Sequence, residues 1–229
     1  SGRDVLGQAQ TGTGKTAAFL IATFSHLLRN PLLANQATDK NPRAVILAPT
    51  RELALQIHSD CGSLGAATGF RCQVVFGGAD YDKQRDKLHA GVDVLIGTPG
   101  RFIDYLKQGV FNLNSVQVMV LDEADRMFDL GFIKDIRYVM RRLPPADMRL
   151  NLLFSATLNQ KVLELAYEHM NDPVSVRIEP EKVTADKVTQ AVYFPGNHEK
   201  QRLLVNLLRQ VEAKRTMVFV NMKHQAEKV

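Results

Sequence analysis

Ala-Gln-Thr-Gly-Thr-Gly-Lys-Thr, at residues 9–16, is the stretch that decides the fold, because it follows the apolar pair Val5 and Leu6 and precedes a helical pattern. A strand, a glycine-rich turn, a Lys-Thr pair and a helix in this order form a P-loop, whose backbone N–H groups and helix N-terminus surround phosphate oxygens. We expect Lys15 to reach the β- and γ-phosphates and the Thr16 hydroxyl to ligate Mg²⁺. Alanine stands where the general pattern has glycine, so the motif alone also admits a glycine-rich turn with a chance Lys-Thr pair. The predicted phosphate-binding residues are Ala9, Gln10, Thr11, Gly12, Thr13, Gly14, Lys15 and Thr16.

Beyond this loop, short apolar runs alternate with amphipathic stretches of helical length. Continuous apolar runs are typical of strands buried on both faces of a parallel sheet. We therefore predict an α/β fold with a parallel sheet flanked by helices, whose ligands bind at the carboxyl ends of the strands. The strand candidates are residues 44–48, 73–76, 92–96, 116–121 and 152–154. Apolar residues at helical spacing are Leu20, Phe24, Leu27 and Leu28 in one helix candidate, and Phe132, Ile136, Val139 and Met140 in another.

The pattern changes near residue 179. Residues 179–187 are polar and include Pro180, which is typical of a linker, and a smaller strand–helix–strand pattern follows, with strand candidates at 190–194 and 216–220. We expect a first domain at residues 1–178, a linker at 179–187 and part of a second domain at 188–229.

Two carboxylates end the apolar run at residues 118–121: Asp122 and Glu123 open the sequence Asp-Glu-Ala-Asp. An isolated acidic pair is usually a solvated strand end, but with a P-loop upstream it predicts a nucleotide hydrolase. We expect Asp122 to hold Mg²⁺ through water, as the metal partner of Thr16, and Glu123 to orient and activate the attacking water. The predicted catalytic set is thus Lys15, Asp122 and Glu123.

With this acidic motif the chain resembles the DEAD-box RNA helicases, which share the P-loop form with alanine at its first position. The resemblance covers essentially the whole chain and implies an RNA-dependent ATPase that uses ATP and Mg²⁺, built from a RecA-like P-loop domain and the beginning of a second RecA-like domain. The other family motifs stand in order at residues 49–54, 77–78, 98–101, 129–132 and 155–157.

By this resemblance, two further groups of residues have roles. The first would grip the sugar-phosphate backbone of RNA, and the second would couple the state of ATP to RNA. Each residue taken alone also fits a helix start, a turn or a helix cap. The RNA-binding group is Arg51, Gly78, Thr98, Gly100 and Arg101, and the coupling group is Asp125, Ser155 and Thr157.

Residues 126–137 and 142–145 resemble the bacterial RhlB-type members of the family. That resemblance implies a cytoplasmic protein of RNA turnover, with RNase E or an RNA-degradation complex as a partner. The adenine-recognition motif of the family would precede Ser1 and the arginines of the second domain would follow Val229, so we expect this chain by itself to hydrolyse ATP poorly.

Composition adds few constraints. The net charge of +5 and a pI of about 9.2 fit a polyanionic partner such as RNA, and no apolar run is long enough to span a membrane. Cys61 and Cys72 have no metal-ligand spacing and indicate free thiols. Two rival functions remain: an RNA-binding scaffold with a vestigial nucleotide site, and a DNA helicase or other P-loop ATPase.

Overall fold

The structure is a computed structural model that describes residues 2–10, 12–32, 40–178, 189, 191–196, 198–211, 215–220 and 226. It divides into two compact units, Ser1–Glu181 and Lys182–Val229.

The first unit is built on a seven-stranded sheet in the order β3-β4-β2-β5-β6-β1-β7, and every neighbouring pair is parallel. This confirms the predicted α/β class with a parallel sheet. The edge strand β7 was not predicted, because its short run is mostly exposed and lacks the apolar signal of the central strands. The strands are β1 (Val5–Gln8), β2 (Ala44–Leu47), β3 (Cys72–Val75), β4 (Val94–Gly97), β5 (Val118–Leu121), β6 (Leu150–Ser155) and β7 (Val174–Arg177).

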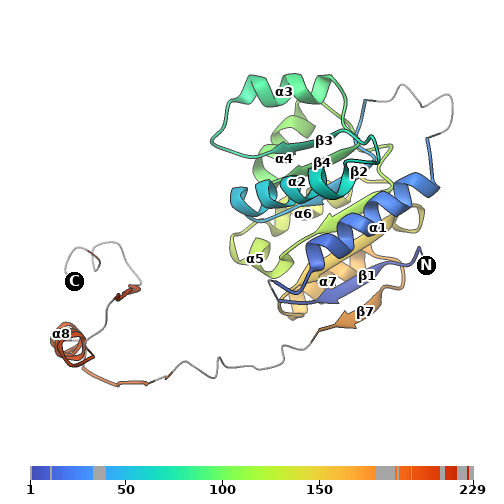
Figure 1. The fold of residues 1–229 in the computed structure, drawn as a ribbon. Coiled ribbons are helices and arrows are strands. Elements are labelled where there is room, and N and C mark those ends of the chain that lie inside the picture. The colour runs from blue at the N-terminus through green and yellow to red at the C-terminus, as the bar shows by residue number, and fades with distance from the viewer. Residues whose placement is uncertain are drawn as a thin grey trace. The chain divides into compact units, whose positions relative to one another are not determined.

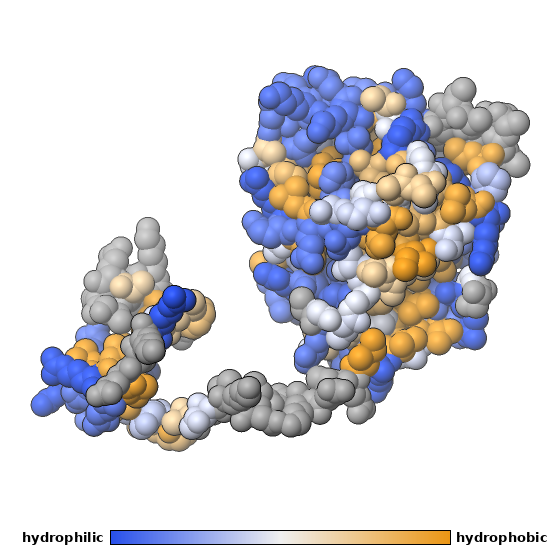
Figure 2. Space-filling view, viewed as in Figure 1, coloured by the Kyte–Doolittle hydropathy of each residue, from blue (hydrophilic) through white to orange (hydrophobic). Residues whose placement is uncertain are grey.

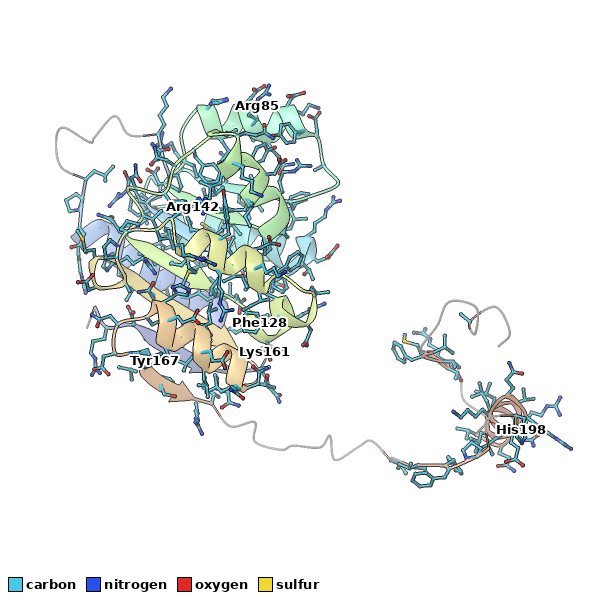
Figure 3. All side chains as sticks on the ribbon, turned by 180° about the vertical axis from the view of Figure 1, so that it is seen from behind. Arg85, Phe128, Arg142, Lys161, Tyr167 and His198 are labelled. Carbon is cyan, nitrogen blue, oxygen red and sulfur yellow. The ribbon has the colours of Figure 1, made fainter. Side chains whose placement is uncertain are left out.

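Helices cover both faces of the sheet (Figure 1). In the opposite view, α6 and α7 come to the front, with Arg142 just after α6 and Tyr167 on α7 (Figure 3). The helices of this unit are α1 (Lys15–Arg29), α2 (Arg51–Gly65), α3 (Tyr81–His89), α4 (Pro99–Lys107), α5 (Ala124–Asp129), α6 (Ile133–Met140), the short 3₁₀ turn η2 (Ala146–Met148) and α7 (Gln160–His169).

Alternation along the strands gives each face its own core. In β2, Ile46 packs with the apolar residues of α1 and α2, whereas Val45 and Leu47 pack with those of α4, α6 and α7. The apolar stripe of α1 includes Leu20, Phe24 and Leu27 as predicted, but Leu28 is 58% exposed. Leu28 lies beyond the edge of the stripe because each residue advances about 100° around a helix.

The second unit contains α8 (Lys200–Gln210), where the apolar spacing predicted a helix. The described residues 191–194 and 216–220 are not in strands, so those two predictions are not met. Strand residues need backbone partners in a neighbouring strand, and none is assigned among the described residues of this unit. Gln190 and the expected linker at 179–187 lie outside the described residues. Among the described helices of the chain, none has the length and hydrophobicity to cross a bilayer.

Candidate functional site

The predicted motifs lie at the carboxyl ends of strands, except for residues 129–132, which begin at the last residue of α5. In a parallel sheet these strand ends share one edge. The strand order divides that edge into two halves. The P-loop after β1, the acidic motif after β5 and Ser155 in β6 belong to three adjacent strands. The motifs expected to grip RNA follow β2, β3 and β4, which are also adjacent.

Positive backbone φ angles shape the P-loop. Gly12 and Gly14 have φ of 87° and 81°, a region that favours glycine, and Gly14 caps the N-terminus of α1. Ala9 is buried, and its N–H donates to the carbonyl of Ser155 at 3.0 Å, which anchors the loop to β6. The Thr13 hydroxyl donates to the Gln10 carbonyl at 2.9 Å. Thr11, predicted to bind phosphate, lies outside the described residues.

Lys15 and Asp122 form an ion pair beneath the loop. Lys15 Nζ lies 3.1 Å from Asp122 Oδ1, and the side chains are 6% and 0% exposed. Burial raises the pKa of Asp122 above its ordinary value, although the Lys15 ammonium opposes this effect. The P-loop lysine is thus held by the acidic motif.

The same carboxylate carries a free acceptor. Asp122 Oδ1 also accepts the Glu123 N–H at 3.0 Å, whereas the buried Oδ2 has no hydrogen-bond partner among the described residues. Thr16 is half-buried at the first turn of α1. No group of three or more His, Cys, Asp or Glu residues could hold a metal in the described part of the chain. Mg²⁺ retains several waters and binds substrate phosphates, so it needs few protein ligands. The unpaired buried Oδ2 of Asp122 therefore fits a Mg²⁺ site.

Glu123 has a backbone conformation that is rare for a side chain of its size, with φ and ψ both at 52°. This turn ends β5 and begins α5. Arg126 Nη1 donates to Glu123 Oε2 at 3.1 Å. Arg126 was not among the predicted site residues, although its position three residues after Glu123, about one helical turn away, was a usable signal.

A hydrogen-bonded cluster joins the acidic motif to β6. The Thr157 hydroxyl and N–H both donate to Asp125 Oδ2, at 2.8 and 2.9 Å. The Asp125 N–H donates to Ser155 Oγ at 3.3 Å, and that hydroxyl donates to the Thr157 carbonyl at 2.8 Å. Burial alone would raise the pKa of Asp125, but the hydrogen bonds, those from Thr157 foremost, hold it below its ordinary value.

The predicted RNA-binding arginines stack on aromatic rings at either end of one loop. The Arg51 guanidinium lies 4.7 Å from the centre of the Phe76 ring, and that of Arg101 lies 4.9 Å from the Tyr81 ring. Gly78, exposed and with φ of 76°, lies in the loop between the two rings. The structure therefore brings Arg51, Gly78 and Arg101 to one surface.

The two other members of that group belong to the same edge. The Thr98 N–H donates to the Val75 carbonyl at 3.1 Å, which places the start of α4 beside the end of β3, and Gly100 is exposed in the first turn of α4. Arg51, Gly78 and Gly100 are exposed at this surface, and Arg101 is half-buried.

An apolar hollow of about 250 Å³ adjoins the P-loop. It is bordered by Ala9 and Lys15 on one side and by Phe19, Phe154 and Ile178 on the other. Figure 2 shows hydrophobic residues gathered on this face of the first unit. A larger hollow of about 690 Å³, between Val5 and His26, contains none of the predicted site residues and lies away from the catalytic carboxylates.

Comparisons with known proteins give the family to which the chain is similar. The family model described as DEAD/DEAH box helicase matches residues 1–165. Three similar proteins carry the name ATP-dependent RNA helicase RhlB. That of Xanthomonas oryzae pv. oryzae is 59% identical over 229 residues, all of this chain and 40% of that protein. Those of Shewanella denitrificans and Vibrio cholerae are 56% identical over 226 residues and 55% over 229, covering 98% and 100% of this chain and 52% of each relative. The chain thus spans about half the length of these relatives or less.

Proposed function

Because the chain belongs to the DEAD/DEAH box helicase family, we propose that it forms the nucleotide-binding part of an ATP-dependent RNA helicase, which locally unwinds or remodels RNA by coupling RNA binding to ATP hydrolysis. The observation that carries this proposal is the contact between Lys15 and Asp122, with Glu123 as the next residue. This contact brings a cation to the carboxylate that would bind the metal, with the proposed general base as the next residue.

The residues of the P-loop bind the phosphates of ATP. The N–H groups of the loop and of the first turn of α1 surround the phosphate oxygens, and Lys15 exchanges Asp122 for the β- and γ-phosphates. This exchange frees the Asp122 carboxylate, which together with the Thr16 hydroxyl would hold Mg²⁺. When bound, Mg²⁺ neutralises charge on the phosphates and helps to orient them.

Glu123 performs the general-base step of this proposal. Its carboxylate orients the water that attacks the γ-phosphate and accepts a proton from it. The hydrogen bond from Arg126 goes to Oε2, so Oε1 can accept the water proton while the ion pair persists.

RNA binds along the surface formed by Arg51, Gly78 and Arg101, with Thr98 and Gly100 beside them. Arginines and exposed N–H groups suit phosphate contacts, which carry no sequence information. Contacts with 2′-hydroxyl groups would distinguish RNA from DNA. The cluster of Asp125, Ser155 and Thr157 would couple the state of ATP to RNA, as the family resemblance implies. Its hydrogen bonds link the acidic motif to the end of β6, within the nucleotide-binding half of the edge.

The domain organisation is also a proposal. Residues 1–178 form the first RecA-like domain, 179–187 the linker and 188–229 the beginning of a second RecA-like domain. Support comes from the division into two compact units near residue 181. It also comes from α8, which forms where the strand–helix–strand pattern predicted a helix.

The decisive experiment uses the full-length protein and measures RNA-stimulated ATP hydrolysis. Glu123→Gln should bind ATP and RNA as the unmodified protein does but lose most turnover, because the amide cannot accept the proton. Glu164→Gln, an exposed glutamate on α7, is the matched control and should retain turnover. Turnover near the unmodified rate in Glu123→Gln would remove Glu123 from the catalytic role.

The same assay separates the two rivals. A scaffold with a vestigial site would show no stimulation at any RNA concentration. A DNA helicase or general P-loop ATPase would respond equally to RNA and to DNA of the same sequence.

We further propose that the protein acts in RNA turnover in the cytoplasm, with RNase E or an RNA-degradation complex as its partner. Support comes from the RhlB-type sequence at residues 126–137 and 142–145. Affinity purification of the tagged full-length protein, with and without ribonuclease treatment, tests the partner. Recovery of RNase E only without that treatment would argue for a shared RNA instead.

A further inference from the structure

Two thiols that lie far from the nucleotide site are in direct contact. Cys61 is in the second half of α2, and Cys72 is the first residue of β3. Their Sγ atoms are 2.7 Å apart. A disulfide bond is about 2.05 Å long, so only a small approach separates these sulfurs from bonding distance.

The two thiols differ in access and in acidity. Cys61 is fully buried, whereas Cys72 is partly exposed. The Cys61 S–H donates to Cys72 Sγ, and this hydrogen bond holds the pKa of Cys72 below its usual value against burial and the nearby Asp93 carboxylate. The same hydrogen bond, together with burial, raises the pKa of Cys61. Cys72 is thus the nucleophile that reaches solvent, and Cys61 is the thiol behind it.

We propose that Cys61 and Cys72 form a redox modification site that closes to an intramolecular disulfide with a small-molecule disulfide, such as oxidised glutathione, as the oxidant. The Cys72 thiolate attacks one sulfur of the oxidant and releases one glutathione thiolate, which leaves a mixed disulfide on Cys72. Cys61 then loses its proton and attacks Cys72 Sγ, and the second glutathione leaves. Two protein thiols are oxidised to one disulfide, and one oxidised glutathione is reduced to two thiols.

The disulfide would join α2 to β3. Both elements lead to the surface of Arg51 and Gly78, but the bond lies toward the other end of each, away from the stacking of Arg51 on Phe76. The oxidised protein should therefore keep its RNA affinity within about twofold. Cross-linking residues 61 and 72 should raise the melting temperature by roughly 5 °C, because it restricts the unfolded chain.

The full-length protein should be equilibrated in buffers of reduced and oxidised glutathione, quenched with an alkylating agent and mapped by peptide mass spectrometry. We expect a cross-linked peptide pair that contains Cys61 and Cys72 and has lost two hydrogens. Cys61→Ser should stop at glutathione on Cys72, and Cys72→Ser should react far more slowly, because its remaining thiol is buried.

Three outcomes would overturn the proposal. They are full alkylation of both cysteines at every glutathione ratio, a disulfide between two copies of the chain, and failure of Cys61→Ser to collect the mixed disulfide. The unmodified protein suffices for the first two, so they remain decisive even if a serine variant folds poorly.

Discussion

Lys15→Met should destabilise the nucleotide-free fold as well as weaken ATP binding. The substitution keeps the length of the side chain but removes the cation that lies 3.1 Å from the fully buried carboxylate of Asp122. Removing one partner of a buried ion pair costs about 3–5 kcal/mol. Protonating a carboxyl of ordinary pKa at pH 7 costs about 4 kcal/mol, and burial has already raised the pKa of Asp122, so protonation limits the loss. We expect a loss of about 2–4 kcal/mol.

The sign of the pH dependence follows from the same pair. Without Lys15, the folded-state pKa of Asp122 rises further above its unfolded value, so the folded variant binds more protons than the unfolded chain in that interval. The loss of stability should therefore be largest above the folded-state pKa of Asp122 and should shrink as the pH falls below it, because Asp122 becomes neutral.

Urea denaturation in nucleotide-free buffer with a chelator measures this effect, with the variants compared at each pH. The matched control is Lys15→Met with Asp122→Asn, which removes the unpaired charge while its amide oxygen can still accept the Glu123 N–H. The double variant should recover most of the lost stability and show little of the added pH dependence. A single variant as stable as the unmodified chain at pH 7.5, or a double variant less stable than the single one, would refute the reasoning.

Three further predictions concern hydrogen bonds and buried groups. Thr157→Val removes a hydroxyl donor from the Asp125 carboxylate and should lower the free energy of unfolding by about 1 kcal/mol, measured by thermal unfolding at pH 7. Thr157→Ser keeps the hydroxyl and should cost less than half as much. Equal losses of stability in the two variants would contradict the assignment to the hydroxyl. Burial holds the pKa of His169 below its usual value, so the unfolded chain takes up a proton before the folded chain as the pH falls. The free energy of unfolding should therefore decrease below about pH 6.5. His169→Gln should flatten this dependence of stability on pH, and an unchanged dependence would exclude His169 as its source. Asp4→Ala removes the buried carboxylate that accepts hydrogen bonds from both the backbone N–H and the side-chain amide of Asn151. The free energy of unfolding, measured by urea denaturation, should fall by about 2–4 kcal/mol. A loss below about 1 kcal/mol would count against these hydrogen bonds as a source of stability.

Much of the site could be predicted because its residues are contiguous in sequence and chemically distinctive. The glycines of the P-loop and the acidic pair at Asp122 can be recognised from their spacing alone. The family resemblance drawn from them is confirmed. The central strands were predicted because strands buried on both faces are continuous apolar runs. The edge strand β7, exposed along most of its length, gave no such signal.

The contact of Asp125 with Ser155 and Thr157 was expected from the family resemblance, but other contacts between distant elements could not be predicted. Cys61 and Cys72 gave no sign of contact, because the approach of α2 to β3 depends on packing rather than on spacing. The stacking of Arg51 on Phe76 and of Arg101 on Tyr81 likewise appears only once the strands are side by side. A short sequence pattern shows which functional side chains a segment contains. Which of those side chains come into contact depends on how the fold packs distant segments together.

Ser155 is one residue through which the fold connects two distant motifs. It lies at the end of β6, between the strand that leads to the P-loop and the strand that leads to the acidic motif. Its carbonyl accepts the N–H of Ala9, and its hydroxyl accepts the N–H of Asp125. If ATP draws Lys15 away from Asp122, the buried ion pair between the P-loop and the acidic motif is lost, and the hydrogen bonds through Ser155 remain as a direct link between the two motifs. Any shift of one motif relative to the other must therefore strain or rearrange the contacts of Ser155, and through them the position of Thr157.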